Sequence, residues 1–189
     1  MNAIGKKWWL LGVLVVLIGA LSISSHSLWM DEAIRIEYAN RSVSDGYFDK
    51  QWGLLQMGLM HLQYLWGSLI GKTEIAYRWL NVPFLMVSAV YFTYILKKNN
   101  LSPLWVLVVC VHPMVVYYMN DAGPYIILLA CSAAVYYHGF YADRQNSISN
   151  SIVTLTWLLI GFCVHFIYGF AVVLYICALL YKWKKNGCI

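Results

Sequence analysis

Long apolar runs, separated by short polar segments, dominate the pattern of this chain. A run of about 18 or more apolar residues is long enough to cross a bilayer as an α-helix. The last run, 151–181, has 31 residues, which suits two short crossings that turn between Val164 and Gly169. The sequence therefore predicts an all-α integral membrane protein, a single membrane domain with about six transmembrane helices at about 8–24, 75–96, 101–119, 123–141, 151–166 and 168–181.

The moderately apolar segment 52–70 decides the topology, because it contains Gln56, His61 and Gln63 and need not cross. Cytoplasmic loops carry an excess of lysine and arginine. If the segment stays outside, eight basic residues face the cytoplasm and five face outward; if it crosses, the count is four against nine. The first arrangement is predicted. It gives an outer loop at 25–74 with juxtamembrane helices, and it places both termini on the cytoplasmic side of the plasma (inner) membrane.

The first apolar run also has the features of a cleavable signal peptide. Lys6 and Lys7 precede it, and small residues lie near its end. We expect an uncleaved first span, because the rest of the chain stays in the membrane in either case.

Composition narrows the classes of function. The chain is 61% hydrophobic and 11% charged, whereas a soluble domain carries about 25% charged residues. The basic excess falls mainly in the predicted cytoplasmic loops, so no nucleic-acid partner is expected. The five cysteines are scattered and have no metal-binding spacing.

Acidic residues concentrate on the outer side of this topology. Seven of the eight carboxylates fall there, although the formal net charge is +5. Asp31 and Glu32 open a short amphipathic segment from Met30 to Tyr38, in which Arg35 lies one turn after Asp31 on the same face. Charged groups this close to lipid are costly unless they face water or a partner, so the pair is a functional candidate.

Three further residues fall at the outer ends of predicted spans, where they are expected to converge with the acidic pair. They are Arg78, Asp121 and His165. Carboxylates act as general bases or metal ligands, and an arginine at headgroup level suits a phosphate. Each of these residues also has a non-catalytic interpretation. Asp31 and Glu32 could cap a short helix in a solvated loop, and Asp121 could belong to a turn before Pro124. His165 could lie at the membrane interface, and Arg78 could anchor the chain to lipid headgroups.

Four short segments of the chain, taken in their order along the sequence, match the motifs of a known family. Ser27–Ala33 contains Trp-Met-Asp-Glu, and Gly71–Leu80 contains a Gly-Lys-Thr-Glu turn followed by Arg-Trp-Leu. His112–Tyr125 ends in Tyr-Tyr-Met-Asn-Asp-Ala-Gly-Pro-Tyr, and Gly161–Gly169 begins Gly-Phe-Cys-Val-His. Together these segments resemble the GT-C membrane glycosyltransferases, the group of the dolichyl-phosphate-mannose-protein mannosyltransferases and ArnT-like enzymes. The resemblance covers about residues 25–181.

The resemblance implies an inverting transferase that moves a sugar from a polyprenyl-phosphate donor to a cell-envelope glycan, lipid or protein outside the membrane. Asp31 would be the catalytic base. Glu32 and Asp121 would be the accompanying catalytic acids, and they would also hold a divalent cation if the reaction uses one. Gly123 stands where the family has an arginine. The expected substrate-binding residues are Arg35, Arg78, Tyr125 and His165.

Full-length members of that group continue with further spans, so the resemblance implies that this chain corresponds to their N-terminal module. Two other functions therefore stay open. One is a non-catalytic membrane subunit that binds lipid-linked sugar for a membrane-protein partner. The other is a transporter of lipid-linked sugars, which needs polar residues at mid-membrane depth, where the spans contain few beyond His112 and His138.

Overall fold

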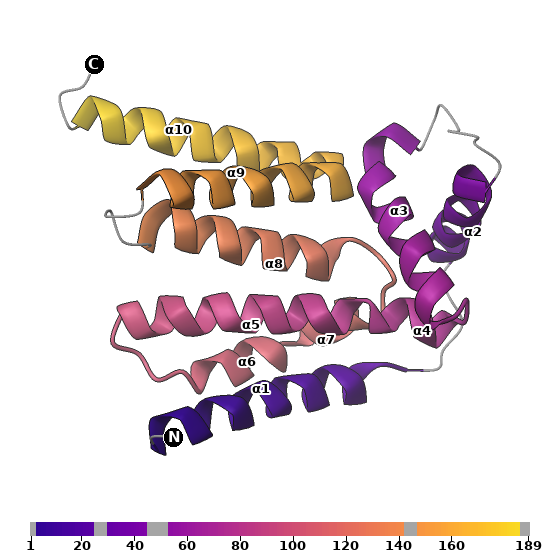
Figure 1. Ribbon diagram of the computed structural model, residues 1–189, viewed down its shortest axis with the longest axis horizontal. Coiled ribbons are helices and arrows are strands. Elements are labelled where there is room, and N and C mark those ends of the chain that lie inside the picture. The colour runs from indigo at the N-terminus through magenta and orange to yellow at the C-terminus, as the bar shows by residue number, and fades with distance from the viewer. Residues whose placement is uncertain (1–2, 25–29, 45–52, 142–146, 186–189) are drawn as a thin grey trace.

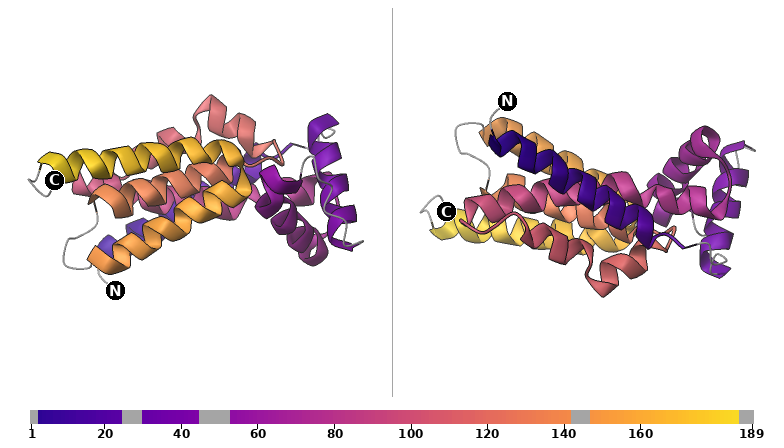
Figure 2. Two further views of the ribbon diagram at one scale, coloured as in Figure 1. Left: turned by 90° about the horizontal axis from the view of Figure 1, so that it is seen from above. Right: turned by 90° about the horizontal axis from the view of Figure 1, so that it is seen from below.

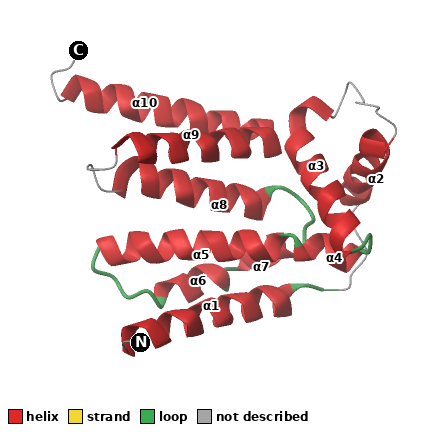
Figure 3. Cartoon of the chain, in the orientation of Figure 1, coloured by secondary structure: helices red, strands yellow, loops and turns green. Residues whose placement is uncertain are grey.

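The computed structural model describes residues 3–24, 30–44, 53–141 and 147–185, and every regular element in these ranges is helical (Figure 3). The prediction of an all-helical protein is confirmed. The elements are α1 (Ala3–Ser22), α2 (Met30–Ser44), α3 (Gly53–Ile70), α4 (Glu74–Trp79), α5 (Asn81–Lys98), α6 (Trp105–Cys110), α7 (Pro113–Met119), α8 (Tyr125–Tyr136), a π-helical turn (Tyr137–Tyr141), α9 (Ser147–Val164), a 3₁₀ turn (Phe166–Tyr168) and α10 (Gly169–Lys185).

The long apolar helices α1, α5, α8, α9 and α10 lie side by side as a bundle (Figure 1). Both views in Figure 2 place α2 and α3 beyond one end of this bundle. The first turn of α1 and the last turn of α10 lie at the opposite end (Figure 1). The two helices of the segment predicted as an outer loop are therefore together at one end of the bundle, opposite the first turn of α1 and the last turn of α10.

The bundle is held by two apolar clusters that meet at α8. One cluster joins α1, α5, α6, α7 and the start of α8, and includes Val15, Leu85 and Ile126. The other joins α3, α8 and α9, and includes Leu59 and Ile127. Ile126 and Ile127 are adjacent and almost fully buried, so α8 is covered on more than one side. A helix that is apolar all round, as α8 is, belongs in such a central position.

The predicted span 101–119 is interrupted. α6 ends at Cys110 and α7 begins at Pro113, with His112 between them in a non-helical conformation (φ −58°, ψ 132°). Proline has no backbone N–H and disfavours the helical conformation in the residue before it. The His112 ring caps the second helix, because its Nδ1 accepts a hydrogen bond from the Met114 amide at 3.3 Å. Pro113 therefore splits this apolar run into two short helices.

Within the described ranges, one continuous helical stretch is long and apolar enough to cross a membrane by length and composition. It is Glu74–Lys98, 25 residues formed by α4 and α5 together. The remaining apolar stretches are shorter: Leu10–Ser22, Tyr125–Tyr141, Ile148–Val164 and Phe166–Leu180. The length and composition of Glu74–Lys98 point to membrane association.

Replacing Gly58 by alanine is expected to destabilise the protein, whereas the same change at Gly12 is not. A Cβ at Gly58 would lie 2.7 Å from the carbonyl oxygen of Cys163, so α3 would have to move away from α9. A Cβ at Gly12 meets no atom within 4 Å. We expect the free energy of unfolding to fall by about 1–3 kcal/mol at Gly58, as at other overpacked positions. Melting temperatures of the purified variants in detergent measure the difference, and equal values would contradict the close approach of α3 and α9.

Candidate functional site

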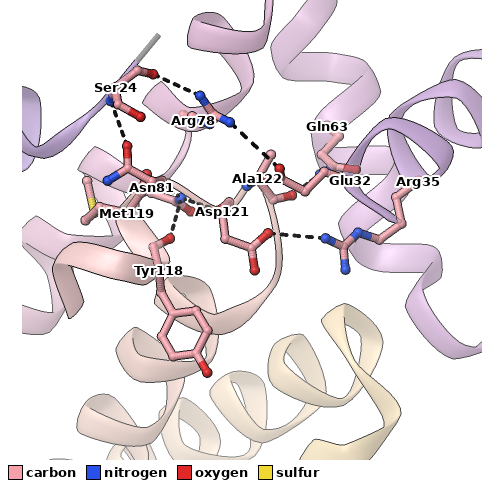
Figure 4. Close-up of polar contacts among 11 residues, drawn as sticks. Ser24, Glu32, Arg35, Gln63, Arg78, Asn81, Tyr118, Met119, Asp121 and Ala122 are labelled. Carbon is pink, nitrogen blue, oxygen red and sulfur yellow. Dashed lines mark hydrogen bonds and ion pairs between the residues drawn. The ribbon is translucent and has the colours of Figure 1, made fainter. Parts of the chain in front are cut away.

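A cavity lies at the end of the bundle that carries α2 and α3, where α2 and α4 meet the loop between α7 and α8 (Figure 4). Its volume is about 720 Å³, and its walls include Glu32, Arg78, Asn120, Asp121 and Tyr125. Four of the residues singled out in the sequence therefore line one cavity, although they come from separate parts of the chain. Asn120 was not singled out.

Glu32 and Arg78 form a buried ion pair in the wall of this cavity. Each side chain is 1% exposed, and Arg78 Nη2 lies 3.8 Å from Glu32 Oε2. The Ala122 amide donates a hydrogen bond to Glu32 Oε1, and Arg78 Nη1 donates one to the Ser24 carbonyl at 2.9 Å. Because both charges are removed from water, each depends on the other for electrostatic compensation. The pair therefore ties α2, α4, the end of the α1 segment and the α7–α8 loop together.

Arg78 reaches this position because α4 is a short helix with a defined start. Gly71 turns the chain out of α3 with φ +127°, a conformation that favours glycine. Thr73 then caps α4, since its hydroxyl accepts a hydrogen bond from the Ala76 amide at 3.2 Å. Arg78 stands in the last turn of α4, just before the chain continues into α5.

Asp121 forms the second ion pair of the cavity, with Arg35 of α2. Arg35 Nη2 lies 3.2 Å from Asp121 Oδ1, and the two side chains are 12% and 18% exposed. A Cβ at Gly123 would lie 2.7 Å from Asp121 Oδ2, so this carboxylate position requires glycine two residues later. Gly123 itself has no side chain, and the positive charge beside Asp121 comes from Arg35 of α2.

Asp31, the predicted base, stands in the first turn of α2, and its side chain lies outside the described part of the structure. Its backbone position is one turn before Arg35, so positions 31 and 35 share a face of the helix. The neighbouring face carries Glu32 and Ile36, both buried. α2 thus buries one flank against the bundle end and carries Arg35 on the flank that it shares with position 31.

Two asparagines that the sequence analysis did not single out hold the α7–α8 loop in place. Asn81 Nδ2 donates to the carbonyls of Tyr118 at 3.1 Å and Asp121 at 2.8 Å (Figure 4). Asn120 Oδ1 accepts a hydrogen bond from the Ser24 amide at 2.6 Å. The signal for Asn81 was present in the sequence, because a polar side chain within an apolar helical run needs hydrogen-bond partners when it is buried.

His165 lies at the turn between α9 and α10 and caps the 3₁₀ turn. Its Nδ1 accepts a hydrogen bond from the Ile167 amide at 3.2 Å, and its ring stacks on Phe166 with centroids 5.2 Å apart. Burial, and then the positive charge of Arg35, lower the pKa of His165 from its ordinary value of 6.5. His165 is not among the residues that line the cavity. The cap that it forms requires an unprotonated Nδ1.

Acidification is expected to weaken the folded state through His165. Because folding lowers the pKa of His165, the unfolded state binds its proton more readily. The stabilising contribution is therefore complete above pH 6.5 and is lost progressively as the pH falls below that value. The drop in melting temperature between about pH 7.5 and pH 5.5 should be smaller in His165→Gln than in the original protein. The same drop in both proteins would contradict this assignment.

The described residues do not fit a divalent cation. Among them, no group of three or more histidine, cysteine, aspartate and glutamate side chains is placed to hold a metal ion. Glu32 and Asp121, the expected ligands, are turned toward Arg78 and Arg35.

Comparison of the chain with family models, with curated proteins and with solved structures finds no match. The assignment of this site therefore rests on its residues and their geometry.

Proposed function

We propose that this protein is a multi-span membrane glycosyltransferase of GT-C type, which transfers a sugar from a polyprenyl-phosphate donor to an acceptor outside the plasma (inner) membrane. The observation that carries the proposal is the cavity at one end of an otherwise apolar bundle. It is lined by the Glu32–Arg78 pair and by Asp121, whose ion-pair partner is Arg35. Charged side chains this close to lipid are costly and usually mark functional sites in membrane proteins.

In this proposal six crossings are formed by α1, by α4 with α5, by α6 with α7, by α8 with its π-helical turn, by α9 and by α10. α10 has 17 residues and is about 25 Å long, against a hydrocarbon core of about 30 Å. Local thinning of the bilayer accommodates helices of this length. Lys97 and Lys98 lie in the last turn of α5, at the end away from the cavity. In this proposal that end faces the cytoplasm, because basic residues concentrate on the cytoplasmic side of membrane proteins.

Arg78 and Arg35 supply positive charge for the donor phosphate. Guanidinium groups bind phosphate through paired hydrogen bonds, and Arg78 lines the cavity itself. Tyr125 also lines the cavity, and its ring lies against that of Tyr118 with centroids 4.3 Å apart. These two rings provide an aromatic wall on which a sugar ring packs.

Asp31 is the base of the proposed reaction. It removes the proton of an acceptor hydroxyl as the hydroxyl oxygen attacks the anomeric carbon. The bond between that carbon and the phosphate oxygen breaks, and polyprenyl phosphate leaves with the electron pair, so the configuration inverts. The resemblance to the GT-C enzymes is what gives Asp31 the base role. Glu32 and Asp121 are ion-paired with arginines.

A non-catalytic subunit is the second candidate, and the same ion pairs favour it. If the two carboxylates that line the cavity serve only to hold Arg78 and Arg35 in place, the site recognises a phosphate without performing transfer. Such a subunit binds the lipid-linked sugar for a membrane-protein partner.

Reconstitution separates the two candidates. The purified full chain is placed in liposomes with a radiolabelled polyprenyl-phosphate sugar and an extract of envelope acceptors. Transfer by the chain alone supports the enzyme. Donor binding without transfer, followed by transfer when a co-expressed membrane partner is added, supports the subunit. A chain that neither binds nor transfers the donor contradicts both.

A further inference from the structure

A second cavity lies between α1 and α5, away from the polar site. Its volume is about 390 Å³, and its lining is apolar except for Thr93, Tyr94 and Lys97. Val15 and Ala89 are buried in it, whereas Val90 and Tyr94 are about half exposed. The cavity is therefore an open trough on the surface of the bundle, with a buried floor and an exposed rim.

Small residues create this trough. Gly12 of α1 lines it, and a Cβ at that position would meet no atom within 4 Å. Ala89 of α5 lines it as well. The lining residues of α5 run from Met86 to Lys97, a rise of about 16 Å along the helix. The hydrocarbon region of one leaflet is about 15 Å thick, so the α5 side of the trough is about as long as one leaflet.

The trough ends at positive charge. Lys97 lines its end, and Lys98 follows at the end of α5. α1 runs antiparallel to α5 beside it, so its first two turns, which carry Lys6 and Lys7, lie at the same end (Figure 1). Basic pockets between transmembrane helices on the cytoplasmic side are binding sites for anionic lipid headgroups.

We propose that this trough binds one acyl chain of an anionic phospholipid from the cytoplasmic leaflet, with the headgroup at Lys97. The proposal rests on the membrane orientation of the proposed function and is independent of sugar transfer. A largely apolar trough with one side about one leaflet long suits an acyl chain, and the lysine at its end selects the negative headgroup over a zwitterionic one.

Lipid retention by the full chain tests this site. The protein is purified in detergent with equal amounts of phosphatidylglycerol and phosphatidylcholine that carry the same acyl chains, and the retained lipid is counted by native mass spectrometry. The original protein should retain phosphatidylglycerol preferentially. Lys97→Gln should reduce that preference about fivefold, the effect of one lysine near a charged lipid surface. Lys72→Gln, an exposed lysine at the other end of the molecule, is the matched control and should leave the preference intact.

Gly12→Leu tests the trough itself, because its side chain enters open space rather than the packed interior. It should lower retention of both lipids at an unchanged melting temperature. Equal retention of the two lipids by the original protein, or full retention by Gly12→Leu, would overturn the proposal. Another contrary result would be an original protein that is a dimer and a Gly12→Leu variant that is a monomer with unchanged lipid retention. The trough would then be a docking face between two copies of the chain. Sugar transfer measured on the same samples keeps failure of the enzyme proposal distinct from failure of this one.

Discussion

Replacing Arg78 by methionine is expected to lower the free energy of unfolding by about 3–5 kcal/mol, the usual cost of removing one partner of a buried ion pair. Methionine keeps much of the volume of the arginine side chain, so the loss of stability is attributable mainly to the missing charge. The Glu32 side chain, which is 1% exposed in the original protein, would lose the guanidinium that compensates its charge. The hydrogen bond to the Ser24 carbonyl would be lost as well. Melting temperature and denaturant resistance in detergent measure the change.

Two further variants isolate the electrostatic part of this effect. Glu32→Gln in the Arg78→Met background removes the uncompensated charge and should restore part of the stability. Arg41→Met breaks the exposed pair with Glu37, whose side chains are 71% and 60% exposed, and should change stability little. If Arg78→Met and Arg41→Met melt at the same temperature, the buried pair does not contribute as described.

Replacing Asp31 by asparagine is expected to reduce sugar transfer by about 10²–10⁴-fold, the usual contribution of a general base. The amide cannot accept the proton of the acceptor hydroxyl, whereas the size of the side chain is unchanged. Initial rates in proteoliposomes measure the effect. Donor binding should persist, because Asp31 has no role in holding the phosphate in this proposal.

Glu37→Gln provides the matched control for that variant. It makes the same kind of change on the same helix, at an exposed carboxylate that pairs with Arg41. Its rate should equal that of the original protein. Full transfer by Asp31→Asn would exclude Asp31 as the base, and equal losses in both variants would indicate a general effect of charge on α2.

The local pattern of apolar and polar residues predicted most of the helices. The length of the run 151–181 predicted a turn between Val164 and Gly169, and α9 ends and α10 begins at these residues. The helix predicted from Met30 to Tyr38 is present and continues to Ser44. The interruption at His112 was not predicted, because the residues on both sides of Pro113 are apolar and the run was interpreted as one continuous span.

The site was only partly predictable, because its geometry depends on contacts between distant segments. The sequence indicated that Glu32, Arg78 and Asp121 would gather at one end of the spans, and they do line one cavity. It did not indicate that Glu32 would be buried against Arg78, since the Ala122 amide that completes its environment lies 90 residues away. The partners of Asn81 were unpredictable for the same reason, because they are carbonyls of a loop that only the fold brings near.

Equilibrium binding measures whether the polar cavity recognises the phosphate of a polyprenyl lipid, as proposed above for the sugar donor. The full chain in nanodiscs is titrated with a polyprenyl phosphate and, separately, with the uncharged polyprenol of the same length. Saturable binding of the phosphate form, at least about tenfold tighter than that of the alcohol, is the predicted result, because hydrogen bonds between charged partners contribute about 1.5–3 kcal/mol. Equal affinity for the two lipids would show that the cavity does not recognise the phosphate.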